Sequence, residues 1–119
     1  MGNGILVKDK TEYKKIYETT SDGVQTYAQI LQQFTSYVVN GEHYKYLLKI
    51  NEKIYHPMTQ YDFIEIDGSS TGTLNIIIRE AYINGNLSGF FEANSSFSIT
   101  NYSNMVPGVG NVYTLYKLQ

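Results

Sequence analysis

A chain of 119 residues suits a single domain with a hydrophobic core, and no apolar run approaches the roughly 20 residues that a membrane-spanning helix needs. The formal charge of −2 and the dispersed Lys and Arg residues leave no basic surface for nucleic acid. Without cysteine there is no disulfide framework, thiolate chemistry or zinc–cysteine site. We therefore expect a domain that neither binds nucleic acid nor inserts into a membrane.

Residues 1–20 are expected to form an N-terminal arm, ahead of a single helix-plus-antiparallel-β domain formed by residues 21–119. Within the arm, Ile5–Val7 has the composition of a short strand. The following stretch, Lys8–Thr20, is the most charged of the chain, and its apolar residues recur at helical spacing. This spacing predicts a short helix there, with Thr11 as its cap.

The clearest helix pattern runs over Ser21–Val39, where one wide apolar stripe lies opposite a polar stripe of Gln, Thr and Ser. Ser21 or Asp22 can cap its start by accepting a hydrogen bond from a free backbone amide. Asn40 and Gly41 can end it, because both residue types tolerate the left-handed conformation. The apolar stripe consists of Tyr27, Ile30, Leu31, Phe34, Tyr37 and Val38.

This helix pattern is unusual because no charged residue lies between Gly23 and Gly41. A solvated helix face usually carries Lys, Glu and Arg. Two interpretations remain open. The helix either lies on the surface and happens to lack charge, or is covered on both sides, by its own sheet and by another subunit. In the second case, the candidate interface residues of a homo-oligomer are Gln25, Gln29, Gln32 and Tyr37.

After Gly41 the pattern changes to strands and turns. The strongest strand pattern, Thr73–Ile83, is followed by Asn84 and Gly85, a favoured two-residue turn because both residues accept positive φ. It predicts a long hairpin over Thr73–Asn94. The other predicted strands are Tyr44–Ile50, Lys53–His56, Tyr61–Asp67, Phe97–Ile99 and Val112–Leu118. The fold class is therefore mainly β (α+β), an antiparallel β-sandwich or jelly-roll-like sheet with one packed amphipathic helix near the N-terminus.

No catalytic or cofactor pattern stands out in the sequence. The two histidines, His43 and His56, lack cysteine neighbours and metal-type spacing, so we expect no metal site and no cofactor. Three carboxylates, Glu65, Asp67 and Glu80, leave a small carboxylate-based hydrolase as an alternative. That alternative requires at least two of them to converge in a pocket, within about 5–10 Å of each other.

Exposed aromatic rings and amides favour a binding function over catalysis. In sugar recognition an aromatic ring covers the apolar face of the sugar, while amides and carboxylates bond its hydroxyls. Tyrosine, present 12 times, suits half-exposed strands and interfaces because its ring is buried while its hydroxyl stays hydrated. Two loops offer such groups, and the candidate ligand-binding residues are Asp67, Ser69, Tyr102, Asn104 and Met105.

Three features together resemble the distal, head-like domain of phage tail-fibre and baseplate receptor-binding proteins. They are the helical segment TSDGVQTYAQILQQFTSYV, the β region rich in Tyr, Asn, Ser and Gly, and the closing strand NVYTLYKLQ. The resemblance implies a homotrimer with a compact β-sandwich that binds a host-surface saccharide, and a place in the virion, on the phage tail. The uncharged helix and the uncharged stretch Ala93–Tyr116 would suit burial between subunits.

We therefore interpret the chain as a non-enzymatic viral structural or receptor-binding module. Besides the hydrolase, one further alternative remains. A helix followed by long antiparallel strands is also the topology of helix-on-sheet domains of the cystatin or hot-dog type, which bind small ligands or proteins. This alternative predicts a helix cradled in a single curved sheet.

Overall fold

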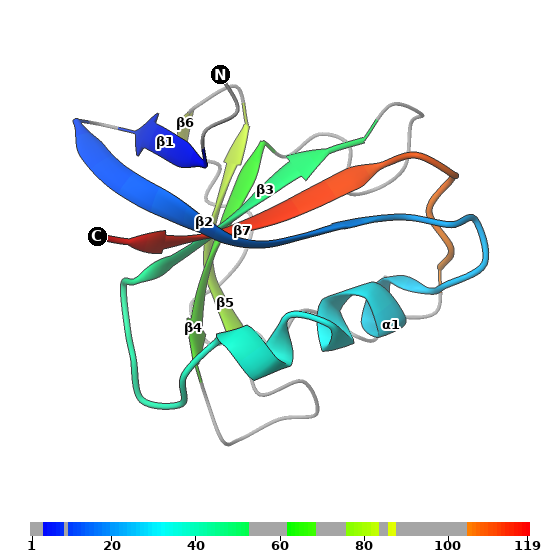
Figure 1. Cartoon of the computed structure of the whole chain (residues 1–119), viewed down its shortest axis with the longest axis horizontal. Helices are drawn as coiled ribbons and strands as arrows, with labels where there is room; N and C mark the ends of the chain where they lie inside the picture. Colours follow the sequence, from blue (N-terminus) through cyan, green and yellow to red (C-terminus); the bar gives the residue numbers. More distant parts are fainter. Residues whose placement is uncertain (1–3, 9, 53–61, 69–75, 84–85, 88–104) are drawn as a thin grey trace.

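The computed structural model describes residues 4–8, 10–52, 62–68, 76–83, 86–87 and 105–119. These residues form a seven-stranded antiparallel sheet in the order β1-β2-β7-β3-β4-β5-β6, with one short α-helix against it (Figure 1). The predicted mainly β class is confirmed. The strands are β1 (Ile5–Lys8), β2 (Thr11–Thr20), β3 (Tyr46–Asn51), β4 (Phe63–Gly68), β5 (Ile76–Ile83), β6 (Asn86–Leu87) and β7 (Val112–Leu118). The helical elements are α1 (Tyr27–Gln32) and the 3₁₀ turn η1 (Thr35–Tyr37).

The predicted helix over Lys8–Thr20 is wrong, because this stretch forms the ten-residue strand β2. β2 pairs with β1 on one side and with β7 on the other, so it lies inside the sheet. Its pairing with β7 shifts register between Lys15 and Tyr17. This irregularity allows two successive residues, Ile16 and Tyr17, to pack against the core. Because of this shift, core-facing and outward-facing side chains do not alternate regularly along β2. The spacing of its apolar residues therefore resembles that of a helix.

The helix begins later than predicted. Thr26, not Ser21 or Asp22, is the N-cap, and it forms a capping box with Gln29. The Asp22 carboxylate instead accepts from the backbone amide nitrogens two and three residues ahead, each at 2.8 Å, which forms a local turn. Gly23 follows with φ of +80°, a conformation that no α-helix contains. These two residues therefore delay the helix.

The helix also ends earlier than predicted. α1 stops at Gln32, and the chain continues through η1 to Val38, which already has extended backbone angles. Gly41 has the expected left-handed φ of +94°, but it follows this irregular segment and does not end the α-helix. The predicted helical stretch is therefore correct in position and wrong in its bounds.

The helical segment packs one side against the sheet, as its apolar stripe predicts. Each stripe residue is buried except Tyr37, which stacks on Tyr17 with ring centroids 4.5 Å apart. Burial of each such side chain contributes about 1.5–3 kcal/mol. The sheet side of the core comes from β3, β4 and β7. The core residues are Tyr27, Ile30, Leu31, Phe34, Val38, Tyr46, Leu48, Ile50, Ile64, Ile66, Tyr113 and Leu115.

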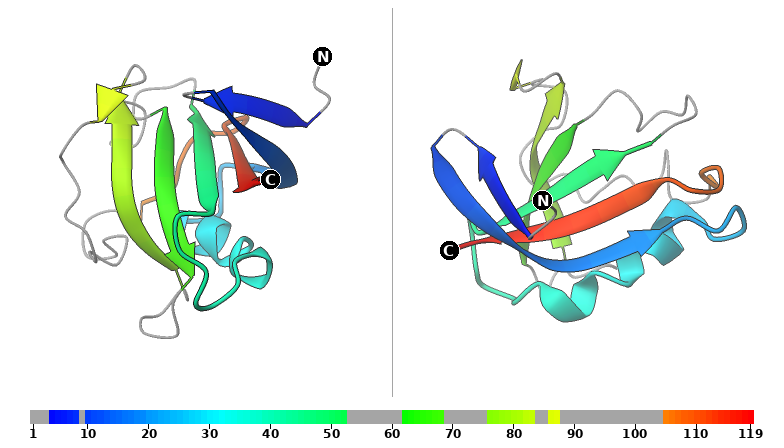
Figure 2. Two further views of the ribbon diagram at one scale, coloured as in Figure 1. Left: turned by 90° about the vertical axis from the view of Figure 1, so that its left-hand side faces the viewer. Right: turned by 45° about the horizontal axis from the view of Figure 1, so that its top comes forward.

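The sheet is strongly curled (Figure 2). The Lys8 ammonium of β1 lies 3.8 Å from the ring centroid of Tyr82 in β5, although four strands separate β1 from β5 in the sheet. The described strands thus form one curved sheet with a helix on one face, the arrangement that the helix-on-sheet alternative predicts. None of the helices in the described residues is long and apolar enough to cross a membrane.

The later strands follow the sequence prediction closely. β7 has the predicted bounds, and β5 pairs with β6 in antiparallel register, which confirms the hairpin where it is described. β3 pairs with β4 and with β7. Both β3 and β4 overlap predicted strands, and each begins two residues later and ends one residue later than predicted. Several predicted features fall outside the described residues, namely Lys53–His56, Asn84-Gly85, the hairpin arm beyond Leu87, and Phe97–Ile99.

Candidate functional site

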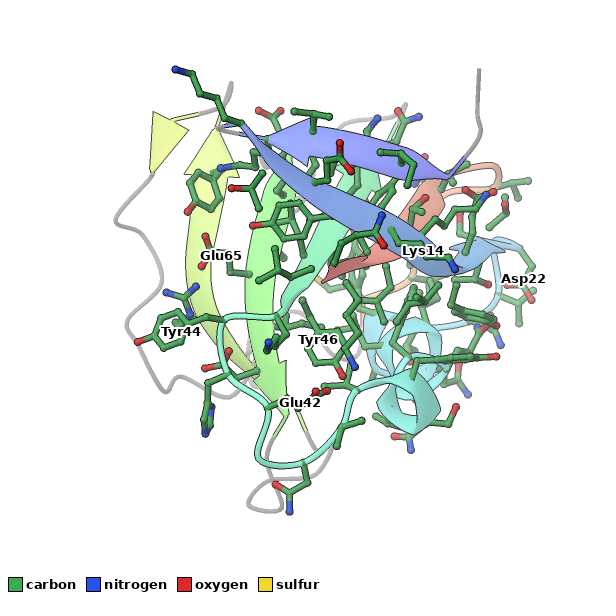
Figure 3. All side chains as sticks on the ribbon, turned by 60° about the vertical axis from the view of Figure 1, so that its left-hand side comes forward. Lys14, Asp22, Glu42, Tyr44, Tyr46 and Glu65 are labelled. Carbon is green, nitrogen blue, oxygen red and sulfur yellow. The ribbon has the colours of Figure 1, made fainter. Side chains whose placement is uncertain are left out.

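The face of β4 that points away from the helix carries two carboxylates. Ile64 and Ile66 are buried in the core on the helix side. Because side chains alternate along a strand, Glu65 and Asp67 point to the opposite face. Figure 3 shows Glu65 on the side of the sheet away from α1. Both carboxylate side chains are largely covered, with exposed fractions of 17% and 13%.

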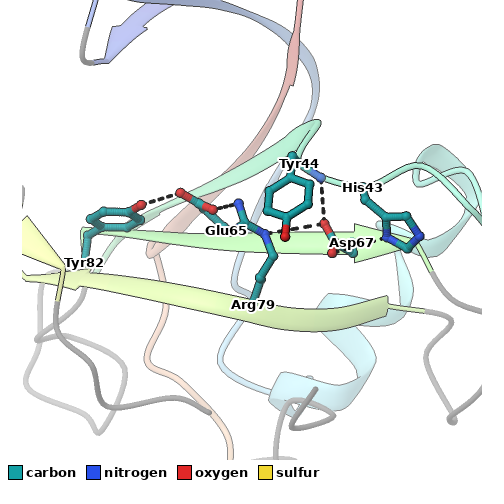
Figure 4. A network of polar contacts seen from close by, with 6 residues as sticks. All are labelled: His43, Tyr44, Glu65, Asp67, Arg79 and Tyr82. Atoms are coloured by element: carbon teal, nitrogen blue, oxygen red, sulfur yellow. Dashed lines mark hydrogen bonds and ion pairs between the residues drawn. The ribbon is translucent and has the colours of Figure 1, made fainter. Parts of the chain in front are cut away.

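Arg79 of β5 lies against both carboxylates (Figure 4). Its Nη2 forms an ion pair with Glu65, and its Nε lies 3.8 Å from Asp67 Oδ1. The register between β4 and β5 shifts at this point, because Glu65 is opposite Glu80 whereas Ile66 is opposite Ile78. Arg79 is the extra residue of this bulge. A bulge changes the direction in which the side chain of the extra residue points. Here that residue is Arg79, and its guanidinium lies against the two carboxylates of β4.

Tyr44 covers the guanidinium. The Arg79 guanidinium carbon lies 3.8 Å from the Tyr44 ring centroid, within the range of a cation–π contact. Tyr44 has φ of +61°, a left-handed conformation that costs a residue with a Cβ on the order of 1–3 kcal/mol. Its backbone amide donates to Asp67 Oδ1 at 2.9 Å, which holds that conformation. The side chain nevertheless stays 65% exposed, more than any other tyrosine in the described residues.

Two further side chains complete the cluster. His43 Nδ1 lies 3.3 Å from Asp67 Oδ2, and the imidazole is mostly exposed. The Tyr82 hydroxyl donates to Glu65. We name this cluster the Tyr44 site, and it consists of His43, Tyr44, Glu65, Asp67, Arg79 and Tyr82 (Figure 4).

The Tyr44 site combines an exposed aromatic ring with a polar surround. It contains two carboxylates and one guanidinium, so its formal charge is −1 with neutral histidine. The ring offers an apolar surface. Beside it the mostly exposed imidazole and, to a lesser degree, the largely covered carboxylates offer hydrogen-bonding groups. The arrangement is therefore suited to a ligand with one apolar face and several hydroxyls.

The hydrolase alternative predicts that carboxylates converge in a pocket. Glu65 and Asp67 do come together, but around the guanidinium of Arg79, which pairs with both. The side chain of Glu80 lies outside the described part of the structure. Among the residues with described positions, no group of three or more His, Asp or Glu side chains could hold a metal ion.

Of the two predicted ligand-binding residues that the structure describes, Asp67 belongs to the Tyr44 site. Met105 lies elsewhere, beside the start of α1, where its carbonyl accepts from the Tyr27 amide at 2.9 Å. The other three, Ser69, Tyr102 and Asn104, lie outside the described residues. Nothing in the sequence alone indicates that Tyr44 has positive φ. Arg79 stands out as an arginine inside an apolar strand, but the sequence does not indicate its partners.

The predicted interface residues lie along the exposed side of the helical segment. Gln29 and Gln32 are exposed, and the Gln29 side chain accepts from the Thr26 amide in the capping box. Gln25 is half-buried and accepts from the Gln33 amide group at 3.2 Å. Tyr37 is 40% exposed.

A second polar cluster is structural. Glu52 accepts hydrogen bonds from the hydroxyls of both Tyr27 and Tyr113, which link α1 to the ends of β3 and β7. Burial, together with these hydrogen bonds to Glu52, raises the pKa of each tyrosine hydroxyl far above its ordinary value. The two rings also meet edge to face at 6.3 Å. This cluster fastens the helix to the sheet.

A third cluster lies where the chain returns from η1 to the sheet. The Tyr46 hydroxyl donates to Glu42, and Lys117 Nζ lies 2.9 Å from the same carboxylate. These two contacts hold the pKa of Glu42 below its ordinary value. Because Tyr46 also belongs to the core, this cluster fixes the loop that leads to Tyr44.

Known proteins give no match to this chain. No family model, no curated protein and no solved structure is similar to it.

Proposed function

We propose that the protein is a non-enzymatic binding module that recognises a host-surface saccharide through the Tyr44 site, as a receptor-binding domain of a phage tail does. The observation that carries this proposal is the Tyr44 side chain, which is 65% exposed yet fixed by a guanidinium and by its own backbone hydrogen bond. An aromatic side chain that is exposed and already ordered loses little entropy when a ligand covers it.

The geometry supports a particular class of sugar. The exposed face of the Tyr44 ring can cover the C–H face of a pyranose, while His43 and Asp67 lie beside it to bond hydroxyls. The site carries more negative than positive charge, so an acidic sugar would meet like charge there. We therefore expect neutral hexoses to bind better than uronic or sialic acids.

A glycan array followed by calorimetry with the strongest neutral glycan tests the proposal. Tyr44→Ala removes the stacking surface, and we expect it to weaken binding at least about tenfold, the effect of roughly 1.4 kcal/mol. Tyr44→Phe keeps the ring and is the matched control, with affinity within about threefold of the wild type. An array without hits, or a Tyr44→Ala variant that binds as tightly as wild type, contradicts the proposal.

A second candidate function is favoured by the fold alone. The helix on one curled sheet also suits a helix-on-sheet domain that binds a small ligand or a protein. Thermal-shift screening against small molecules and peptides separates the two candidates. A ligand that stabilises the wild type and Tyr44→Ala equally would favour this second candidate.

The absence of catalysis is a further part of the proposal. A hydrolase that used the carboxylates of β4 would lose its rate in Glu65→Gln. We expect no hydrolysis of any glycoside that binds. A measurable rate in the wild type that Glu65→Gln abolishes would establish an enzyme.

A further inference from the structure

Lys8 of the strand β1 contacts the Tyr44 site across the curl of the sheet. Its Nζ lies 3.8 Å from the ring centroid of Tyr82, within the range of a cation–π contact. β1 pairs with β2, whereas Tyr82 belongs to β5, so strand pairing alone does not bring the two residues together. The contact therefore joins two distant parts of the curled sheet.

Tyr82 connects this contact to the exposed ring of the site. The Tyr82 hydroxyl donates to Glu65, and the Glu65 carboxylate forms an ion pair with Arg79. The Arg79 guanidinium in turn lies 3.8 Å from the Tyr44 ring centroid. Figure 4 shows these four side chains following one another in this order. An unbroken line of direct contacts thus leads from Lys8 to Tyr44.

The hydrogen bond between Tyr82 and Glu65 is the step on which Lys8 acts. A cation over the face of a phenol draws electron density from the ring, which makes the hydroxyl a stronger hydrogen-bond donor. The acceptor is largely covered, because the Glu65 side chain has an exposed fraction of 17%, so water competes little for it. A carboxylate that is held firmly by Tyr82 keeps one orientation towards the guanidinium of Arg79.

We propose that Lys8 is a positioning residue for the Tyr44 site. Its ammonium strengthens the hydrogen bond from Tyr82 to Glu65. Glu65 in turn keeps the Arg79 guanidinium against the Tyr44 ring. As a contribution to saccharide binding, this role rests on the proposed function, whereas the effect of Lys8 on Arg79 does not.

Nuclear magnetic resonance on the full chain tests the effect on Arg79 without any ligand. Arg79 is the only arginine of the chain, so its Nε–H gives a single signal, and its buried Nε slows exchange with water. The ring current of Tyr44 displaces this signal, and Tyr44→Ala gives its position without the ring. Lys8→Met keeps an unbranched stem and removes the ammonium. We expect it to move the Arg79 signal, by more than the line width, towards its position in Tyr44→Ala.

Lys14→Met is the matched control, because it removes a second ammonium from the same β1–β2 hairpin. Lys14 is exposed and pairs with Ile5, which lies on the opposite face of β1 from Lys8. The Arg79 signal should stay at its wild-type position in this variant. Both lysines are at least partly exposed, so both variants should fold, which circular dichroism checks.

The route through Tyr82 has its own test. Tyr82→Phe keeps the ring under the ammonium but lacks the hydroxyl. In that background Lys8→Met should leave the Arg79 signal where Tyr82→Phe alone places it, because the two changes then remove the same interaction. If Lys8 only held β1 against β5, Lys8→Met would move the signal equally in both backgrounds.

Calorimetry with the strongest neutral glycan gives the effect on binding. Lys8→Met should weaken the affinity about two- to fivefold, the effect of losing one exposed cation–π contact. Lys8→Arg should restore it, since a guanidinium also stacks on an aromatic ring. An Arg79 signal that Lys8→Met leaves in place, or that Lys14→Met moves as far, overturns the proposal. A chain that binds no glycan would contradict the proposed function alone, and the Arg79 signal would still decide the role of Lys8.

Discussion

At the scale of the residue, the Tyr44 site depends on a backbone conformation that favours glycine. Tyr44 has φ of +61°, which glycine adopts freely and alanine does not. We therefore expect Tyr44→Gly to have a free energy of unfolding about 1 kcal/mol higher than Tyr44→Ala, because both remove the ring but only glycine relieves the strain. Urea unfolding of the two variants measures the difference.

His43 is the matched control for this comparison, because its φ is not positive. There the order should reverse, with His43→Ala more stable than His43→Gly by about 0.4–1 kcal/mol, since glycine adds entropy to the unfolded chain. If alanine were as stable as glycine at Tyr44, the left-handed conformation would not be strained.

The candidate site could be predicted from the sequence only in part, and the reason lies in single residues. Asp67 was recognisable as a carboxylate at a strand end beside a polar turn. The roles of Tyr44 and Arg79 were not, because they arise from a positive φ and from a bulge between two strands. Both features depend on which strands become neighbours, and the local pattern of apolar residues does not encode them.

At the scale of the element, one glycine sets how closely the helical segment approaches the sheet. A Cβ on Gly68, at the end of β4, would come within 2.6 Å of the Val39 carbonyl carbon and 3.0 Å of the Asn40 nitrogen. The atoms that such a Cβ would meet belong to the backbone, which cannot move aside as the end of a flexible side chain can. We therefore expect Gly68→Ala to lower the free energy of unfolding by about 2 kcal/mol or more.

Gly41 offers the matched comparison for Gly68. It has φ of +94°, and an added Cβ would meet nothing within 4 Å. Gly41→Ala should therefore cost only the strain of a left-handed alanine, about 1–2 kcal/mol, with no displacement of the helical segment. Urea unfolding measures both losses. A smaller loss for Gly68→Ala than for Gly41→Ala would show that the close approach is not tight.

The fold was more predictable than the site, and the elements that failed did so for physical reasons. β7 and β5 are rich in strand-forming residues, and β5 is followed in the sequence by the favoured turn pair Asn84-Gly85, so the sequence pattern was sufficient. β2 contains an irregularity that packs Ile16 and Tyr17 together against the core, so its spacing resembled that of a helix. The start of α1 was misplaced because Asp22 forms a local turn in place of a helix cap.

At the scale of the whole molecule, the Tyr44 site and the helical segment lie on different faces of the sheet. The carboxylates of the Tyr44 site point away from α1, whereas the uncharged helical segment Gly23–Gly41 packs on the opposite face. A homo-oligomer formed through the helical segment would therefore leave the Tyr44 sites uncovered. Several weak saccharide sites on one assembly can bind a surface far more tightly than one site. Self-association and ligand binding should thus be separable by mutation.

The contact between helix and sheet through Glu52 should make the fold sensitive to alkaline pH. Burial and the hydrogen bonds to Glu52 raise the pKa of Tyr27 and Tyr113 above the ordinary value of 10.0. The unfolded chain releases these protons near pH 10, while the folded chain keeps them. Unfolding therefore releases protons above pH 10, and the stabilisation, which is complete below that pH, is progressively lost above it.

The expected slope follows from the number of tyrosines involved. Above pH 10 the free energy of unfolding should fall by up to about 1.4 kcal/mol per pH unit for each of the two hydroxyls. Urea unfolding at a series of pH values between 8 and about 11.5 measures this slope, with absorbance at 295 nm as an independent record of tyrosine ionisation. Tyr113→Phe removes one of the two titrating groups, so its slope should be shallower, although its stability at neutral pH is lower by the lost hydrogen bond. A variant slope equal to that of the wild type would mean that the Tyr113 hydroxyl ionises alike in the folded and unfolded chains, and that Glu52 does not hold it.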